Sequence, residues 1–383
     1  MNSYYRQKRY WVVLALVVLG VAGITYHGFD HGGAVQAKSE AKAKTVKHSS
    51  TVKTQLNIPP IDAHDQQTKE IDQEIKQTDY SGTALVFKNG KPIFHQAYGY
   101  ADQVNQRKNS TDGLFGIASV AKNMTAMLVM REIQEGRLSL NQHIKVFYPQ
   151  LPNADQITIL QLLNMSSGYK QTNTSTDTMS AMDYVNYNIG HIEDPGYKTW
   201  SYKAVNYSVL DGILQKVTGK TYPQLFDEYF HAQKNYAFYD YDAFLKSDQH
   251  TQSYDAADGH QFGNNPVIFN REVGTGNIAL TDSTFYQYFR DELAGKLVSQ
   301  TCLEKMMQPA DNSDYSGGMY AQRFANRYYL HGMILGFEPT IYSSTDGKNM
   351  VILLSNHNTD NVNAPKPHAN INLGETIYQQ ITN

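Results

Sequence analysis

Apolar residues repeat with a helical period through the middle of the chain and with a strand period near both of its ends. The helical period predicts helices over residues 61–79, 115–131, 157–165, 205–218, 284–297 and 373–381. Strand patterns cover residues 83–87, 93–98, 327–334, 340–344 and 349–355, and Asn89-Gly90 predicts a hairpin turn between the first two. Strands at both ends with helices between them predict an α+β fold, in which a helical region is inserted into the sheet.

Two stretches of the chain lack a clear period. Residues 170–195 are polar and irregular, and residues 230–270 are rich in tyrosine but poorly patterned. We predict no regular element from either stretch.

The N-terminal segment has the pattern of an export or anchoring sequence. Three basic residues within the first ten positions precede an uncharged apolar run over residues 11–24. We expect residues 1–26 to form a cytoplasmic tip and a single-pass membrane anchor, with a secretory signal sequence as the alternative. Residues 27–58, rich in Lys, Ser, Thr, Ala and Gln, predict a disordered stalk, and residues 59–383 an extracellular folded domain at the cell membrane.

Composition excludes several classes of function. The net charge is −3 and 18% of the residues are charged, so no nucleic-acid-binding face is expected. Cys302 is the only cysteine, which excludes an internal disulfide framework and cysteine-cluster metal sites. Walker, dinucleotide, H-E-x-x-H and G-x-S-x-G motifs are absent from the sequence. We therefore predict no metal, no cofactor and no nucleic-acid partner.

Ser119 and Lys122 stand three residues apart at the start of an apolar-periodic run. Residues at this spacing share one face of a helix, so Lys122 can reach the Ser119 hydroxyl. A lysine in a largely apolar site loses part of its preference for charge and can act as a base toward a serine nucleophile. Because three other S-x-x-K copies occur in the chain, the motif alone is equally consistent with a helix-capping serine and a solvated lysine.

Five stretches, in order, resemble the motifs of one known family. They are FGIASVAKNMTA, EGRLSLNQHIKVFYPQLPNADQITILQLLNMSSGY, PGYKTWSYKAVNYSVLDGILQKVTGKTY, GTGNIALTDSTFYQYF and YYLHGMILGFEPTIYSSTDGKNMVILLSN. Over about residues 75–383 the chain resembles the serine β-lactamase and penicillin-binding-protein superfamily, in its class C-like branch of esterases and D,D-peptidases. The resemblance implies an antiparallel sheet of N- and C-terminal strands flanked by helices, with an inserted helical subdomain.

The resemblance implies a role for three side chains. Ser119 matches the nucleophile and Lys122 the general base for acylation. Tyr202 matches the tyrosine that passes a proton to the leaving group and then activates water. Together they imply a covalent acyl-enzyme and no metal.

The strand facing the nucleophile is implied to supply binding groups. His331 matches the Lys or His that opens the third motif, His331-Gly332-Met333, and could orient a substrate carboxylate or support Tyr202. The oxyanion hole would join the Ser119 N–H to that of Met333 or Ile334.

The sequence departs from the family pattern at two positions. Ala204 replaces the asparagine of the Tyr-x-Asn motif, whose amide contacts the acyl-side amide of peptide and lactam substrates in the family. Met333 stands where glycine is usual and narrows the space beside the nucleophile. Both departures weaken the case for a β-lactamase or an ordinary transpeptidase and leave the implied acyl-enzyme chemistry intact.

We therefore expect a cell-surface serine hydrolase that releases D-alanine from D-alanyl esters of teichoic or lipoteichoic acid. An ester needs no amide recognition and has a better leaving group than a peptide. One alternative is a D,D-carboxypeptidase acting on peptidoglycan stem peptides that end in D-Ala-D-Ala. The alternative from another class is a non-catalytic wall-binding or sensor protein on the same fold.

Overall fold

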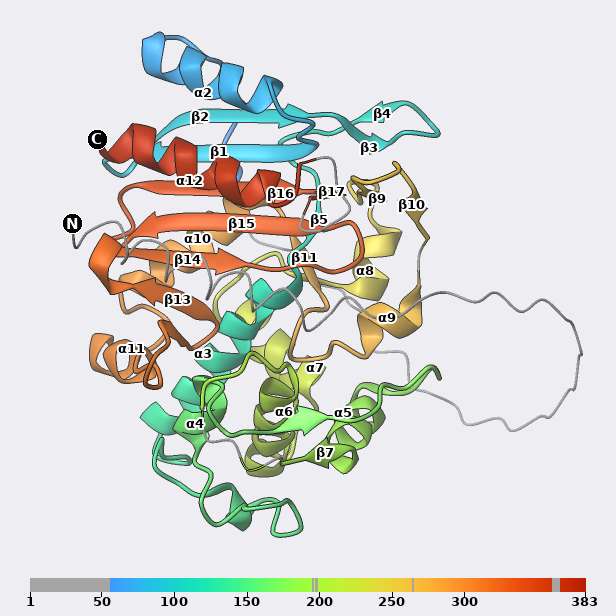
Figure 1. Cartoon of the computed structure of the whole chain (residues 1–383), viewed down its shortest axis with the longest axis vertical. Helices are drawn as coiled ribbons and strands as arrows, with labels where there is room; N and C mark the ends of the chain where they lie inside the picture. Colours follow the sequence, from blue (N-terminus) through green and yellow to red (C-terminus); the bar gives the residue numbers. More distant parts are fainter. Residues whose placement is uncertain (1–55, 195, 197–198, 264, 360–365) are drawn as a thin grey trace, which may run out of the picture. The chain divides into compact units, whose positions relative to one another are not determined.

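The computed structural model describes residues 56–194, 196, 199–263, 265–359 and 366–383, and its centre is a seven-stranded sheet (Figure 1). All neighbouring strands are antiparallel. In spatial order they are β12 (Tyr315–Ser316), β13 (Met319–Gln322), β14 (Arg327–His331), β15 (Glu338–Ser344), β16 (Met350–Ser355), β1 (Gly82–Lys88) and β2 (Lys91–Tyr98). Strands from the two ends of the chain meet where β1 pairs with β16, as the sequence predicts.

The turn between β1 and β2 is built by the residues that predict it. Asn89 and Gly90 have φ of 51° and 76°, values in the left-handed region that asparagine and glycine tolerate best. The predicted hairpin is therefore confirmed.

One face of the sheet is covered by the two terminal helices, α2 (Gln66–Lys76) and α12 (Ala369–Thr382) (Figure 1). Ile71 of α2 and Ile377 of α12 are buried in one cluster with sheet residues such as Val86 and Tyr342. An Asp65 side chain caps α2 by accepting from the Thr68 N–H, which explains why this helix begins later than the predicted residue 61.

The other face packs against α10 (Asp282–Leu293), with α11 (Gln300–Met306) and α3 (Ala121–Gln134) beyond it. Leu85 and Phe87 point to this second face, because they alternate along β1 with the residues that face α12. They belong to a larger buried apolar cluster that also contains Met124 of α3. Both faces of the central strands are therefore buried: every residue of β16 is buried, as is every residue of β1 and β15 except the last.

A helical region lies between the N-terminal and C-terminal strands of the sequence (Figure 1). It contains α4 (Ile159–Leu163), α5 (Ala181–Gly190), α6 (Val205–Thr218) and α7 (Tyr222–Phe226). Helices α3, α4 and α5 all pack on α6. Helix α6 ends at the predicted Gly219, which has φ of 69°.

The two stretches without a clear period are not wholly irregular. Helix α5 lies inside residues 170–195 and begins at a Ser180 cap. Residues 230–270 hold short pieces of structure buried by aromatic packing. These are part of the π-helix η3 (Asp227–Gln233), β8 (Tyr239–Asp240), α8 (Tyr241–Lys246), β9 (Ser253–Asp255), β10 (Gln261–Phe262) and α9 (Pro266–Asn270).

The remaining elements are short. They are β3 (Tyr100–Asp102), β4 (Arg107–Lys108), β5 (Phe115–Gly116), η1 (Ala118–Val120), η2 (Ile144–Val146), β6 (Lys170–Gln171), β7 (Ile192–Glu193), β11 (Ile278–Leu280), η4 (Arg323–Ala325) and β17 (His357–Asn358).

The predicted anchor and nearly all of the predicted stalk lie outside the described residues. Ile58, which the prediction includes in the stalk, is buried, and its N–H donates to Ser283 Oγ at 3.2 Å. The packed part of the chain therefore begins before residue 59. Among the helices of the described ranges, none is both long and apolar enough to cross a membrane.

Candidate active site

Ser119 lies in the 3₁₀ turn η1, immediately before α3, and Lys122 lies in the first turn of that helix. Lys122 Nζ is 2.9 Å from Ser119 Oγ, and the lysine is 1% exposed. Ala118 enters this turn with φ of 46°, a backbone strain that costs about 1–3 kcal/mol and is typical of functional sites. The local spacing thus brings the two predicted side chains together, with Ser119 itself half-buried.

Lys122 has a second partner from a distant segment. Its Nζ donates to the Thr275 carbonyl oxygen at 2.9 Å. The turn that carries this carbonyl is fixed by a Thr125 hydroxyl, which donates to Gly274 O, and by a Glu272 carboxylate that accepts from the Thr275 hydroxyl. Two acceptors therefore orient the lysine amine beside the serine oxygen. The GTGN stretch predicts a glycine-rich turn here, but the sequence cannot show that a backbone carbonyl of this turn accepts a hydrogen bond from Lys122.

Tyr202 lies against the same lysine. Lys122 Nζ is 5.5 Å from the centre of the Tyr202 ring, and Tyr315 of β12 packs edge-on against this ring at 5.4 Å. Tyr315 was not foreseen from the sequence, since nothing distinguishes it among 28 tyrosines. The three side chains with predicted catalytic roles thus form one group, supported by a buried aromatic wall.

Gly332 packs directly on the backbone of the nucleophile. A Cβ atom at this position would lie 2.6 Å from the Ser119 nitrogen and 3.0 Å from the Ala118 Cβ. Only a residue without a side chain fits here without displacing the turn. The close approach brings the start of the loop between β14 and β15 to the Ser119 N–H.

We call residues 332–337 the oxyanion loop, because the second predicted oxyanion donor lies in it. Ile334 is not available for that role, since its N–H donates to Phe337 O at 3.1 Å and the Phe337 N–H donates back to Ile334 O at 3.0 Å. Of the two predicted donors, Met333 remains, directly after the glycine that touches Ser119.

Strand β14 ends at His331 rather than at the predicted residue 334. Neighbouring residues of a strand point to opposite faces of the sheet. Gly332 faces Ser119, whereas the His331 ring lies on the α12 face, with Nε2 3.3 Å from Glu338 Oε1. The expected role of His331, to orient a substrate carboxylate or to support Tyr202, stays a prediction.

The missing asparagine is not replaced by Asn206. Its amide is buried and already paired, accepting from the Ser167 hydroxyl at 2.6 Å and donating to Lys203 O at 2.9 Å. Ala204, at the predicted position, is the residue before α6 and offers a methyl group only. The wall beside Tyr202 therefore has no side-chain amide at the position where the family carries one.

A buried carboxylate supports α3 from behind. Glu292 of α10 is 0% exposed and accepts from the Asn123 amide at 3.0 Å, and Asn123 also donates to Gly317 O. Burial raises the pKa of Glu292 to about 8. The residue next to Lys122 is thus locked between α10 and the β12–β13 turn.

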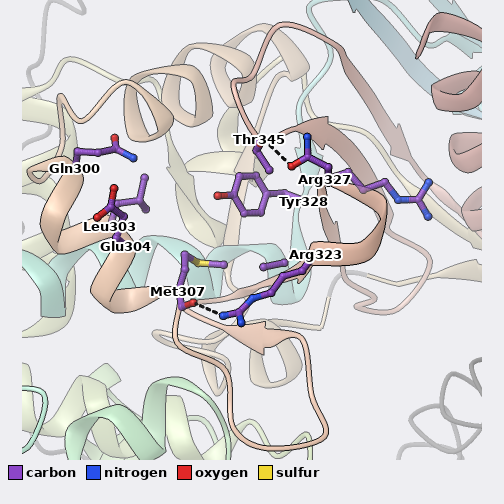
Figure 2. A pocket seen from close by; sticks show the side chains of 10 residues that line it. Gln300, Leu303, Glu304, Met307, Arg323, Arg327, Tyr328 and Thr345 are labelled. Atoms are coloured by element: carbon purple, nitrogen blue, oxygen red, sulfur yellow. Dashed lines mark hydrogen bonds between the residues drawn. The ribbon is translucent and has the colours of Figure 1, made fainter. Parts of the chain in front are cut away.

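A cavity of about 320 Å³ lies elsewhere, between α11 and the β13–β14 hairpin (Figure 2). Its lining combines apolar Leu303, charged Glu304 and Arg323, and the Tyr328 ring, and it includes none of the predicted site residues. In the part of the chain that the structure describes, no three His, Cys, Asp or Glu side chains gather where they could hold a metal ion.

Comparisons with known proteins identify the family of this chain. A family model described as Beta-lactamase matches residues 68–375. PbpX of Bacillus subtilis (strain 168), which bears the name of a penicillin-binding protein, is 28% identical over 332 residues, covering 83% of this chain and 79% of its own. The "Teichoic acid D-alanine hydrolase" of Staphylococcus aureus (strain MRSA252) is 26% identical over 310 residues, covering 76% of this chain and 74% of its own.

Solved structures share the fold. FmtA from Staphylococcus aureus superimposes with a TM-score of 0.73 and 21% identity, covering 85% of this chain and 92% of its own. The D-amino acid amidase from Ochrobactrum anthropi SV3 gives 0.70 and 18%, covering 82% and 98%. The predicted α+β class is therefore confirmed, and the chain belongs to the beta-lactamase family of serine hydrolases.

Proposed function

We propose that the protein hydrolyses D-alanyl esters of teichoic or lipoteichoic acid at the outer face of the cell membrane, through an acyl-enzyme on Ser119. The observation that carries the catalytic part is the buried Lys122 amine, 2.9 Å from Ser119 Oγ. The absence of an amide at Ala204 supports an ester over a peptide, and the relative named for teichoic acid D-alanine hydrolysis supports the same substrate.

The proposed reaction has two halves. Lys122 takes the Ser119 proton as Oγ attacks the ester carbonyl, and the N–H groups of Ser119 and Met333 stabilise the oxyanion. The bond to the polyol oxygen breaks, and Tyr202 supplies the proton that this oxygen takes up. Water then attacks the alanyl-serine ester and gives a proton to Tyr202. The bond to Ser119 Oγ breaks, this oxygen takes back the proton held by Lys122, and D-alanine is released.

The N-terminal segment completes the proposal. A single-pass anchor followed by a stalk of about 30 residues would hold the domain on the order of 30 Å from the membrane. Lipoteichoic acid and the membrane-proximal part of the wall lie within that reach. The D-alanylated polymer is the proposed partner, and neither a metal nor a cofactor takes part in the proposed chemistry.

Release of D-alanine tests the proposal. The purified full-length chain is incubated with D-alanylated lipoteichoic acid and, in parallel, with a stem pentapeptide ending in D-Ala-D-Ala, with Ser119→Ala as the control. We expect release from the polymer by the wild type only. Release from the pentapeptide alone would favour the D,D-carboxypeptidase, and release from neither, with tight wall binding, would favour the non-catalytic alternative.

A further inference from the structure

The two ends of the oxyanion loop are bridged by side chains. His331 is the last residue of β14 and Glu338 the first residue of β15, so their contact closes the loop at its base. Glu338 is 0% exposed, and the His331 side chain is 15% exposed. We propose that Glu338 is a positioning residue for catalysis, which holds the loop where Gly332 meets Ser119. The inference rests on the proposed function only in taking Ser119 as the nucleophile.

The other oxygen of Glu338 is anchored to a different part of the chain. Its Oε2 accepts from the Thr359 N–H at 2.6 Å, from the Thr359 hydroxyl at 3.0 Å and from the Asn370 amide at 2.8 Å. Asn370 lies in the first turn of α12, and its own N–H donates to the Thr359 hydroxyl. The carboxylate thus ties the loop base to the terminal helix that covers the sheet.

The tip of the oxyanion loop has separate supports. A Cβ on Gly336 would lie 2.3 Å from the Tyr254 nitrogen, so the tip is seated on β9, and the Asn358 amide donates to Leu335 O at 3.2 Å. The base is held by the Gly332 N–H, which donates to Pro339 O at 3.2 Å, and by the Glu338 contacts. Removing Glu338 should therefore loosen the base, next to Met333, leaving it held by the Gly332–Pro339 hydrogen bond, while the tip stays seated.

The contacts of Glu338 are directional. Its buried carboxyl group meets His331 through one oxygen and accepts from Thr359 and Asn370 through the other. An apolar side chain at residue 338 would leave the Thr359 and Asn370 donors without this acceptor and could not fix where the loop begins and ends. The hydrogen bonds of Glu338 therefore fit a positioning role.

The same molecule offers a matched control. His95 of β2 and Asp282 of α10 form another carboxylate–histidine pair, with 3.0 Å between Nε2 and Oδ2 and both side chains 0% exposed. This pair joins β2 to α10 and is not part of the oxyanion loop. Breaking it removes a buried contact of the same chemistry without touching the loop base.

The test uses the full-length protein and p-nitrophenyl acetate as a general ester substrate. Phenylboronic acid serves as an inhibitor that forms a tetrahedral adduct with the serine and so mimics the transition state. Glu338→Ala should lower kcat about 10–100-fold with KM within about threefold, because a misplaced oxyanion donor acts on the transition state. The dissociation constant of phenylboronic acid should rise by a similar factor. Asp282→Ala should lower Tm and leave kcat within about twofold of the wild type.

Glu338→Gln serves as the conservative variant. Its amide oxygen can keep the Thr359 and Asn370 contacts, so kcat should fall less, by about 3–10-fold. If Glu338→Ala does not fold, Glu338→Gln serves as the test. A kcat of Glu338→Gln within about twofold of the wild type would then overturn the inference. An unchanged kcat in Glu338→Ala, or an equal kcat loss in Asp282→Ala at a similar Tm, overturns it as well. Failure to release D-alanine from lipoteichoic acid would reject the proposed substrate while these results still stand.

Discussion

On one side of the candidate active site, Ser119 and Lys122 come from a single helical turn, whereas the facing oxyanion loop depends on residues from several segments. The serine–lysine contact of 2.9 Å follows from a spacing of three residues at the start of α3. The loop is placed by Gly332 against Ser119 and by Glu338, which contacts β14, Thr359 and α12.

This difference separates two tasks in the proposed mechanism. In that mechanism the helix side supplies the nucleophile and the base. The loop side would supply an oxyanion donor and the wall against which the substrate lies. The loop side also carries Met333, where the family usually has glycine. We therefore expect the loop side, which is assembled from distant segments, to decide substrate choice.

Removing the nucleophile should have the largest effect. Ser119→Ala should lower kcat for p-nitrophenyl acetate by at least about 10³-fold, because no other group in the site can form the acyl-enzyme. Tm should stay close to the wild-type value, since Ser119 is half-buried and its hydroxyl contacts the Lys122 amine. Retained turnover would mean that the helix side does not carry the chemistry.

Tyr202→Phe should come next. Loss of the hydroxyl removes the proposed proton carrier, so kcat should fall about 10²-fold while the ring still packs against Tyr315. An unchanged kcat would assign proton transfer to Lys122 alone.

A methyl group at Gly332 tests whether the two sides must touch. Gly332→Ala would place a Cβ 2.6 Å from the Ser119 nitrogen, so the loop must move and kcat should fall about 30-fold. Gly190→Ala is the matched control, because a Cβ there meets no atom within 4 Å. Equal kcat values for the two variants would show that the close approach is not needed for turnover.

Glu292, which supports α3 from behind, should affect the stability of the helix side rather than the reaction rate. Because burial raises its pKa to about 8, the folded state binds its proton more tightly than the unfolded state, whose glutamate has an ordinary pKa near 4.5. The stability from this protonated group is present at low pH and is lost as pH rises toward 8, by at most about 1.4 kcal/mol per pH unit. Urea unfolding of wild type and Glu292→Gln at pH 5, 6.5 and 8 should therefore diverge, and parallel curves would contradict this.

Sequence patterns predicted the features that depend on neighbours in the chain. The β1–β2 hairpin, the Gly219 helix end and the Ser119–Lys122 contact are all local. Helix α5 escaped prediction because it has only ten residues, of which Tyr184, Val185 and Ile189 are the buried ones, and so short a run does not show a clear helical period. Its packing on α6, which no local pattern encodes, makes it helical.

On the loop side the sequence pattern misses where the strand ends. The pattern predicts a strand to residue 334, but β14 ends at His331, and Ile334 pairs with Phe337 across the loop. This turn depends on contacts with Ser119 and β9, which a local pattern does not contain. The Thr275 carbonyl and the Thr359 and Asn370 donors are also tertiary partners that no spacing could reveal.

The most direct test of the central claim is the mass of the group trapped on Ser119. The full-length protein is mixed with D-alanylated lipoteichoic acid, quenched in acid, digested and analysed by mass spectrometry. The account predicts one alanyl group on the peptide that contains Ser119, and none in Ser119→Ala. An unmodified Ser119 peptide, together with a peptidyl group after the same treatment with stem pentapeptide, would contradict it.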